Sequence, residues 1–132
     1  MGVKITAKYI GNDNVEVTHL PTGDKIITDL PVDNGGKGRT FSPTDLLASA
    51  VASCILTIMG VVAKRENINI EGSTIEIEKH MAENPRRVSK LVGKIKIIGS
   101  SEEKKKKLVS VIKNCPVSKS LHPDIELKFD IE

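Results

Sequence analysis

Aromatic side chains are scarce in this sequence of 132 residues, which contains one tyrosine, two phenylalanines and no tryptophan. Proteins that bind single-stranded nucleic acids stack the bases on aromatic rings, and nucleic-acid partners in general call for a pronounced basic surface. The net charge of +3 is too small to indicate such a surface. We therefore expect no nucleic-acid partner.

Cysteine is also rare, since the chain has only Cys54 and Cys115, which lie 61 residues apart. Two cysteines do not form the disulfide framework of a small secreted protein, and neither lies in a Cys-x-x-Cys or Cys/His pattern of zinc-site spacing. His19 and His80 fall on predicted strands without ligand spacing, so we expect neither a metal nor another cofactor. The two cysteines either act together in redox chemistry or occur in the same chain by coincidence.

Charge is missing from one long run, the 18 residues from Leu46 to Ala63. The run approaches the length of a membrane span, but neither flank carries an interfacial aromatic anchor. Apolar residues recur instead at helical spacing beside a weakly polar stripe, which favours a helix buried inside a protein. The predicted apolar face consists of Leu47, Val51, Cys54, Ile58 and Val61. We expect no membrane association.

A signal peptide is missing as well, because the segment from Met1 to Thr6 has neither a basic nor an apolar region. This indicates a cytoplasmic protein. The length of the chain and its ordinary hydrophobic content of 39 % predict one compact domain, residues 1–132.

Alternating apolar and polar residues predict three short strands before the uncharged run, over residues 3–10, 14–19 and 25–28, connected as a meander. The helix then begins after Ser42, with a proline at its first position and the Asp45 carboxylate in its first turn. Between strands and helix, the glycine-rich residues 33–40 match no phosphate-binding motif and predict a mobile loop. This loop brings Lys37 and Arg39 near the helix start, where one of them could reach a reacting group.

Two more strands, a second helix and a last strand are predicted after the uncharged helix. Alternation favours an antiparallel hairpin in which Ile75 faces Ile97. The second helix begins at Ser100 or Ser101, and the last strand covers residues 125–131. The order of three strands, helix, two strands, helix and strand belongs to the α+β class, with two helices on one side of a mainly antiparallel sheet.

Both cysteines fall on faces that point into this core, where thiols are usually inert. Pro116, however, directly follows Cys115 and lets it act as the N-cap of a new short helix, whose backbone N–H groups would stabilise a thiolate. Cys54 has polar hydroxyls beside it, at Ser53 and Thr57. These residues alone leave two interpretations open: two inert buried thiols, or two thiols whose pKa values are shifted by their surroundings. In the second interpretation, Cys115 is the more acidic thiol.

Two segments carry a family resemblance. They are Ser-Pro-Thr-Asp-Leu-Leu-Ala-Ser-Ala-Val-Ala-Ser-Cys, residues 42–54, and Asn-Cys-Pro-Val-Ser-Lys-Ser-Leu, residues 114–121. Together with the predicted order of strands and helices, they resemble the OsmC/Ohr superfamily, named after osmotically inducible protein C and organic hydroperoxide resistance protein. The resemblance implies a single OsmC-like domain over residues 1–132 and an intertwined homodimer with two active sites at the subunit interface.

The resemblance also implies a thiol peroxidase. Cys54 would attack an organic hydroperoxide and become a sulfenic acid, and Cys115 would resolve it as an intramolecular disulfide. A dithiol reductant, such as a lipoylated protein, would reopen the bridge. The apolar side chains of Leu47, Val51 and Ile58 suit the alkyl tail of such a substrate.

One position departs from the characterised peroxidases of the family. They carry a glutamate ten residues before the reactive cysteine, which pairs with an arginine; here that position is Thr44. Asp45 is the nearest carboxylate and Arg39 the best candidate arginine. Pro-Thr-Asp-Leu-Leu looks more like a less characterised branch that carries Pro-Thr-Glu-Leu-Leu. The alternative function is therefore a dimer without peroxidase activity that binds an apolar small molecule in the interface cleft.

Overall fold

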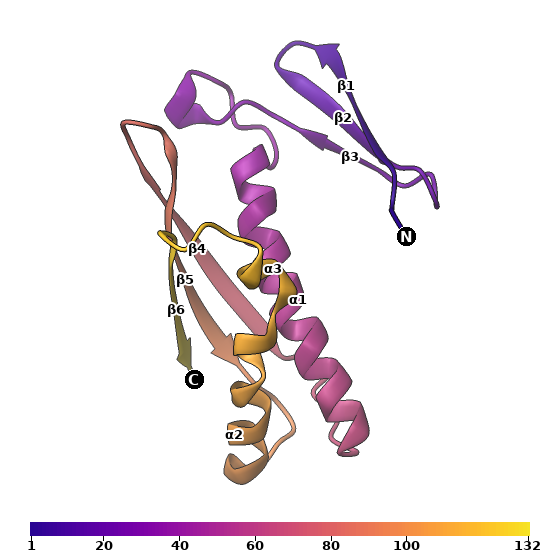
Figure 1. The fold of residues 1–132 in the computed structure, drawn as a ribbon, viewed down its shortest axis with the longest axis vertical. Helices are drawn as coiled ribbons and strands as arrows, with labels where there is room; N and C mark the ends of the chain where they lie inside the picture. The colour runs from indigo at the N-terminus through magenta and orange to yellow at the C-terminus, as the bar shows by residue number, and fades with distance from the viewer. The chain divides into compact units, whose positions relative to one another are not determined.

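The computed structural model of the protein describes residues 1–132, whose contacts group into two compact units, Met1–Leu46 and Leu47–Glu132 (Figure 1). Helix α1 (Pro43–Arg65) begins in the first unit and continues through the second. That the two units together form a single domain stays a prediction.

The first unit is built on the meander that the sequence predicts. Strands β1 (Ile5–Gly11), β2 (Asn14–His19) and β3 (Lys25–Thr28) form an antiparallel sheet in the order β1-β2-β3. The turn between β1 and β2 uses Asn12 and Asp13 at positive φ, 56° and 68°, which these two residue types tolerate better than most. A 3-10 turn, η1 (Val32–Asn34), follows β3.

This small sheet leaves much of its apolar surface uncovered. In residues 3–10 and 25–28, six large apolar side chains are each at least 46 % exposed: Val3, Ile5, Tyr9, Ile10, Ile26 and Ile27. A three-stranded sheet is stable only when a hydrophobic face is packed against something, and monomers rarely expose large apolar patches. The first unit therefore carries a surface suited to packing.

The second unit contains a second three-stranded sheet, in the order β4-β5-β6. Strands β4 (Thr74–Ala82) and β5 (Arg87–Lys96) pair antiparallel, whereas β6 (Glu126–Ile131) runs parallel to β5. The α+β class and the mainly antiparallel pairing predicted from the sequence are confirmed.

Helices α1 and α2 (Glu102–Ser110) pack on one face of this sheet and share its core (Figure 1). The core is formed by Ala48, Val51, Ile55, Met59, Ala63, Ile68, Val88, Leu91, Ile95, Ile97, Leu108 and Cys115. The most buried face of α1 is thus rotated from the predicted one, and Val61, predicted to point inward, is 48 % exposed. Ser53 and Thr57 are also exposed, so α1 presents an uncharged stripe to its surroundings.

By length and composition alone, α1 is also long and apolar enough to cross a membrane. One such helix is weak evidence, because the core helix of a soluble protein passes the same test.

The segment after α2 is less regular than the sequence predicts. Ser101 caps α2, its hydroxyl accepting a hydrogen bond from the Lys104 N–H at 3.3 Å. The helix ends at Ser110, and a 3-10 turn, η2 (Ile112–Asn114), intervenes before Cys115. A new short helix, α3 (Pro116–Lys119), then begins after Cys115 as predicted.

The register of the β4–β5 hairpin differs from the predicted one by two residues. Ile75 pairs with Ile95 and Ile77 with Gly93, where the sequence predicted Ile75 opposite Ile97. Alternation fixes which face each residue occupies, and a slip of two residues preserves the faces. Between β5 and β6, Gly93 lies opposite Phe129, where a side chain would collide with the ring.

Gly93→Ala is expected to destabilise the protein by about 1–3 kcal/mol, the usual cost of overpacking. The added Cβ would lie 2.6 Å from Cδ1 of Phe129 and 3.3 Å from Cδ1 of Ile75. Urea unfolding followed by circular dichroism measures the loss, and Phe129→Leu in the same chain should recover part of it. A Gly93→Ala protein as stable as the parent would refute this account of the packing between β5 and β6.

Candidate functional site

Cys54 lies in the middle of α1 and is partly exposed. The long apolar run holds it there, since Val51 and Ile55 on the same helix are fully buried against the sheet. Cys54 itself packs at the margin of this core. Its sulfur is therefore fixed by a rigid element yet remains within reach of a small molecule.

Cys115 is fully buried, between η2 and α3. Pro116 cannot continue the preceding turn but suits the first position of a helix, so the chain restarts at this point. Cys115 consequently becomes the N-cap of α3, and its Sγ accepts a hydrogen bond from the Ser118 N–H at 3.4 Å. The predicted capping role of Cys115 is confirmed.

The structure brings the two cysteines together. Both thiols are free, and they lie close enough together for each to shift the pKa of the other. Their environments push the two pKa values apart. Burial, followed by the contact with Cys115, raises the pKa of Cys54, and the Val117 N–H offsets this only in part.

The pKa of Cys115 is lowered from its ordinary value. Burial alone would raise it, but hydrogen bonds from the Cys54 thiol and from Ser118 together outweigh that effect, with a further contribution from the Val117 N–H. Charge in the pair is thus favoured on Cys115. This agrees with the local sequence argument that Cys115 is the more acidic thiol.

Ser118 also contributes a buried hydroxyl. Its Oγ has no hydrogen-bond partner of good geometry, although it lies close enough to Cys115 to lower the pKa of that thiol. An unsatisfied buried hydroxyl is costly and usually has a specific reason. Sequence reasoning missed Ser118 as a site residue; its position three residues after an N-cap cysteine was the available signal.

Asp45 forms a capping box at the start of α1. Its Oδ2 accepts a hydrogen bond from the Ser42 N–H at 2.9 Å, and the Asp45 N–H donates to the Ser42 Oγ at 3.1 Å. The Ser42 Oγ also lies 3.2 Å from the Thr44 Oγ1. This reciprocal pair satisfies backbone groups at the helix start and fixes where the helix begins.

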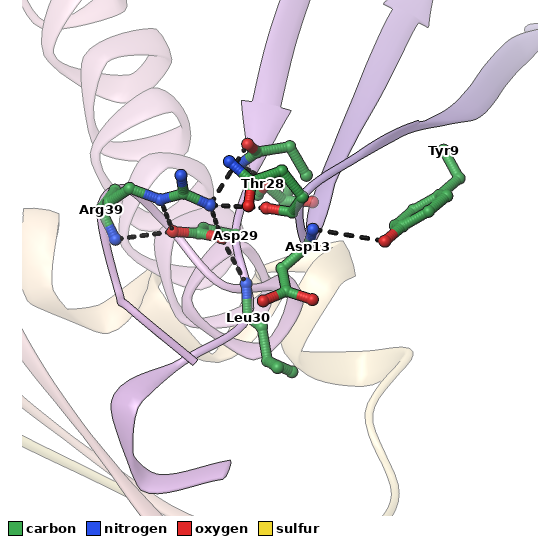
Figure 2. Close-up of polar contacts among 8 residues, drawn as sticks. Tyr9, Asp13, Thr28, Asp29, Leu30 and Arg39 are labelled. Atoms are coloured by element: carbon green, nitrogen blue, oxygen red, sulfur yellow. Dashed lines mark hydrogen bonds and ion pairs between the residues drawn. The ribbon is translucent and has the colours of Figure 1, made fainter. Parts of the chain in front are cut away.

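Arg39, the candidate activating arginine, is held by a buried carboxylate. Its Nε donates to Oδ2 of Asp29 at 2.8 Å, and its Nη2 donates to Oδ1 at 3.0 Å (Figure 2). The same Nη2 reaches the Asn12 carbonyl at 2.6 Å and the Asn14 Oδ1 at 3.3 Å. Arg39 thereby links the end of β3 to the β1–β2 turn, and the loop before α1 is tied down more than the sequence predicted.

Asp29 itself was not singled out from the sequence. It is only 1 % exposed, and hydrogen bonds from the side chain and backbone of Arg39 hold the pKa of its carboxyl well below the usual range. The matching interaction raises the pKa of Arg39. A single acidic residue among apolar neighbours at a strand end was the available signal, because such a carboxylate requires a partner when buried.

The predicted substrate-binding residues differ in accessibility. Val51 is fully buried, whereas Leu47 and Ile58 are partly exposed. On α1, Leu47 and Ile58 lie seven residues before and four residues after Cys54, which places all three on one side of the helix. Leu47 and Ile58 thus offer apolar surface beside the accessible thiol.

An apolar groove of about 600 Å³ lies in the second unit, between the α2–α3 segment and β6, and Ser118 is among its lining residues. Its lining includes Val109, Ile112, Leu127 and Phe129, with Lys113 and Lys119 among the polar residues. The structure contains no cluster of three or more His, Cys, Asp or Glu side chains that could hold a metal ion.

Comparison with known proteins identifies relatives of this chain. The family model described as OsmC-like protein matches residues 36–130. A crystal structure from Psychrobacter arcticus 273-4, of a protein proposed to be induced by osmotic stress and to act in a detoxification response, is 43 % identical, with a TM-score of 0.93. The alignment covers 100 % of this chain and 98 % of that one.

More distant structures share the fold. The organic hydroperoxide resistance protein OsmC of Legionella pneumophila is 22 % identical with a TM-score of 0.77, covering 100 % of this chain and 97 % of its own. The organic hydroperoxide resistance protein OhrB of Bacillus subtilis is 21 % identical with a TM-score of 0.70, covering 100 % and 98 %. No curated protein matches the sequence at a significant level.

Asp29→Asn is expected to destabilise the protein at neutral pH, because the variant removes the charged partner of Arg39. The lowered pKa of Asp29 means that folding favours its carboxylate. The stabilisation is therefore complete above the unfolded-state pKa of about 3.9 and is lost as the pH falls below it toward the folded-state pKa. Urea unfolding between pH 7 and pH 3 measures the difference between parent and variant.

That difference should shrink as the pH falls below about 4, as the carboxylate becomes protonated in the unfolded chain. Asp24→Asn, a change at an exposed carboxylate of the same unit, is the control and should leave the stability nearly unchanged. A destabilisation by Asp29→Asn that stays constant down to pH 3 would argue against the ionic role of Asp29.

Proposed function

Because the chain belongs to the OsmC-like protein family, we propose that it is a cysteine-based peroxidase that reduces organic hydroperoxides. The observation that carries this proposal is the proximity of two free thiols of unequal exposure. Cys54 is partly exposed and Cys115 is buried, and the two thiols lie close enough to shift each other's pKa. An accessible thiol with a second thiol close by can be oxidised and then resolved as a disulfide.

In the proposed cycle, the Cys54 sulfur attacks the distal oxygen of the hydroperoxide and the O–O bond breaks. The products are a Cys54 sulfenic acid and an alcohol. The Cys115 thiolate then attacks the Cys54 sulfur, forming the disulfide and releasing hydroxide, which is protonated to water. A dithiol such as a lipoyl group returns two electrons by thiol–disulfide exchange and restores both thiols.

The surroundings of Cys54 favour an organic substrate. Leu47 and Ile58 flank the thiol on α1, and no charged residue lies on this helix between Asp45 and Lys64. An alkyl group gains about 0.8 kcal/mol for each methylene that it buries, which hydrogen peroxide cannot do. The names of the Legionella and Bacillus relatives refer to organic hydroperoxides as well.

Cys54→Ser is expected to abolish the consumption of cumene hydroperoxide supported by a dithiol, because the serine hydroxyl cannot replace the thiolate. In the parent protein, one equivalent of hydroperoxide should give one Cys54–Cys115 disulfide per chain, detected by mass spectrometry of peptides. Cys115→Ser should instead accumulate oxidised Cys54. Continued turnover in the Cys54→Ser protein would exclude the proposed peroxidase.

A second candidate function is a protein without peroxidase activity that binds an apolar small molecule. The interactions of the two candidate activating residues favour it: Arg39 pairs with Asp29, and Asp45 closes the capping box with Ser42. Position 44 moreover holds a threonine in place of the family glutamate. This candidate gains support if hydroperoxides oxidise Cys54 no faster than a free thiol while an apolar ligand raises the melting temperature.

We also propose that the working form is a homodimer. The meander exposes apolar side chains, and α1 exposes an uncharged stripe that includes Ser53, Thr57 and Val61. A glycine, Gly60, lies on the same side of α1, although a Cβ added to it would meet nothing within 4 Å in the rest of the chain. A glycine inside a helix costs about 1 kcal/mol relative to alanine, so close packing by a second copy would account for it.

Gly60→Ala distinguishes an α1 stripe that is exposed to solvent from one that is packed against a second copy. In a chain whose α1 stripe is free, the added methyl group should stabilise the helix by about 1 kcal/mol. If a second α1 packs there, the same methyl group should weaken the dimer, and we expect a higher dissociation constant in analytical ultracentrifugation. Lys106→Ala, on the exposed side of α2, is the control. A stabilised protein with unchanged self-association would contradict packing at this stripe.

A further inference from the structure

The groove between the α2–α3 segment and β6 takes no part in the thiol chemistry proposed above. Neither cysteine is among its lining residues, and its volume of about 600 Å³ lies in the range of small-molecule sites. A second hollow of about 350 Å³ adjoins it, because Val109 and Ser110 line both. The two hollows form one elongated surface depression beside α2, which we call the β6 groove. All of its lining residues belong to the second unit.

The floor of the β6 groove is apolar. Side chains alternate along a strand, so Leu127, Phe129 and Ile131 of β6 share the face that lines the groove. Val109 and Ile112 contribute apolar surface from the opposite wall. All five side chains retain some exposure to solvent, and Ile131 is 38 % exposed. A ligand that covered this floor would therefore remove apolar surface from water, which favours binding.

The rim of the β6 groove is cationic. Lys113 and Lys119 line the larger hollow and Lys106 lines the smaller one, and all three are exposed. None of the three side chains has an ion pair or hydrogen-bond partner within the chain. The one carboxylate in the lining, Glu102, is paired with Lys105 at 3.5 Å. The groove thus combines an apolar floor with positive charge that no group of the chain neutralises.

The side chains that line the larger hollow offer few hydrogen bonds to a ligand lying on the floor. The Ser110 hydroxyl already donates to the Lys107 carbonyl at 2.7 Å, and the Ser118 Oγ is buried. A peptide in this position would leave backbone N–H and C=O groups without partners, which is costly when they are removed from water. A hydrocarbon chain needs no such partners. The lining therefore favours an alkyl chain over a peptide.

We propose that the β6 groove binds a long-chain carboxylate. The alkyl chain lies on the apolar floor, and the carboxylate lies beside Lys113 or Lys119 at the rim. An anionic end group complements these ammonium groups, whereas an uncharged amphiphile gains nothing from them. The proposal is independent of the peroxidase function, since no step of the proposed thiol cycle takes place in this groove.

Isothermal titration calorimetry with decanoate, below its micelle concentration, tests the site on the full chain. The parent protein should bind one decanoate per chain. From octanoate to decanoate, each added methylene should raise the affinity about twofold to fourfold, because it leaves water for the apolar floor. 1-Decanol has the same chain without the charge and should bind about fivefold more weakly. Equal affinities for decanol and decanoate would overturn the role of the lysines.

The double variant Lys113→Gln/Lys119→Gln locates the carboxylate. It should weaken the binding of decanoate about fivefold and leave that of decanol unchanged. Lys128→Gln is the matched control, because Lys128 is exposed on β6 and lies between Leu127 and Phe129, on the opposite face of the strand. If Lys128→Gln weakens decanoate binding as much for each charge removed, the net charge alone attracts the anion and the proposed site is wrong.

Ser110→Phe tests the groove itself. Ser110 is exposed and lines both hollows, so a phenyl group there should fill the groove and abolish decanoate binding. A circular dichroism spectrum like that of the parent verifies that the variant is folded. Unchanged decanoate binding by this folded variant would place the ligand elsewhere and overturn the proposal.

Two further results would assign the groove to another occupant. If the parent binds no decanoate and Ser110→Phe increases the monomer fraction in analytical ultracentrifugation, a second copy of the chain covers the groove. If a hexaglutamate peptide binds as tightly as decanoate, the groove accepts an acidic protein segment. Either result overturns the proposal, as does the absence of decanoate binding by the parent protein.

Discussion

The proximity of Cys54 and Cys115, each of which shifts the pKa of the other, is the constraint on which the proposed chemistry of this protein depends. Two elements have to be placed correctly for it to form. The packed face of α1, including Val51 and Ile55, fixes Cys54 against the sheet. The break after η2 and the restart of the helix at Pro116 fix Cys115. Because rigid elements hold both thiols, keeping them close together costs little further conformational entropy.

The charged residues of the first unit have structural tasks that the sequence did not reveal. Arg39 neutralises the buried Asp29, and Asp45 satisfies backbone groups at the start of α1. A carboxylate in such a pair is stabilised by its partner and is less available to another group. Both carboxylates therefore serve the structure of the first unit itself. Position 44, where the family peroxidases have glutamate, holds a threonine, which cannot take part in an ion pair.

Two surfaces of the chain lack the cover that apolar surfaces normally have in water. The sheet of the first unit exposes Ile5 and Tyr9, and α1 exposes the stripe that contains Ser53 and Thr57. The middle of α1 carries no charge, and the helix resembles a membrane helix by composition. A second copy that covers this stripe would explain the absence of charge. A helix packed on both sides by protein needs no charged face to remain soluble.

The sequence by itself determined the class of the fold, the start of α1 at Pro43 and the new helix after Cys115, because alternation, capping residues and proline act over a few neighbouring residues. It also indicated that both cysteines point inward. Tertiary structure alone decided the β4–β5 register, because alternation allows registers that differ by two residues, and the partner of Arg39, which is Asp29. It likewise decided how far Cys54 and Cys115 differ in exposure and acidity, because burial and hydrogen-bond donors such as Ser118 belong to the packed chain and have no periodic signature in the sequence.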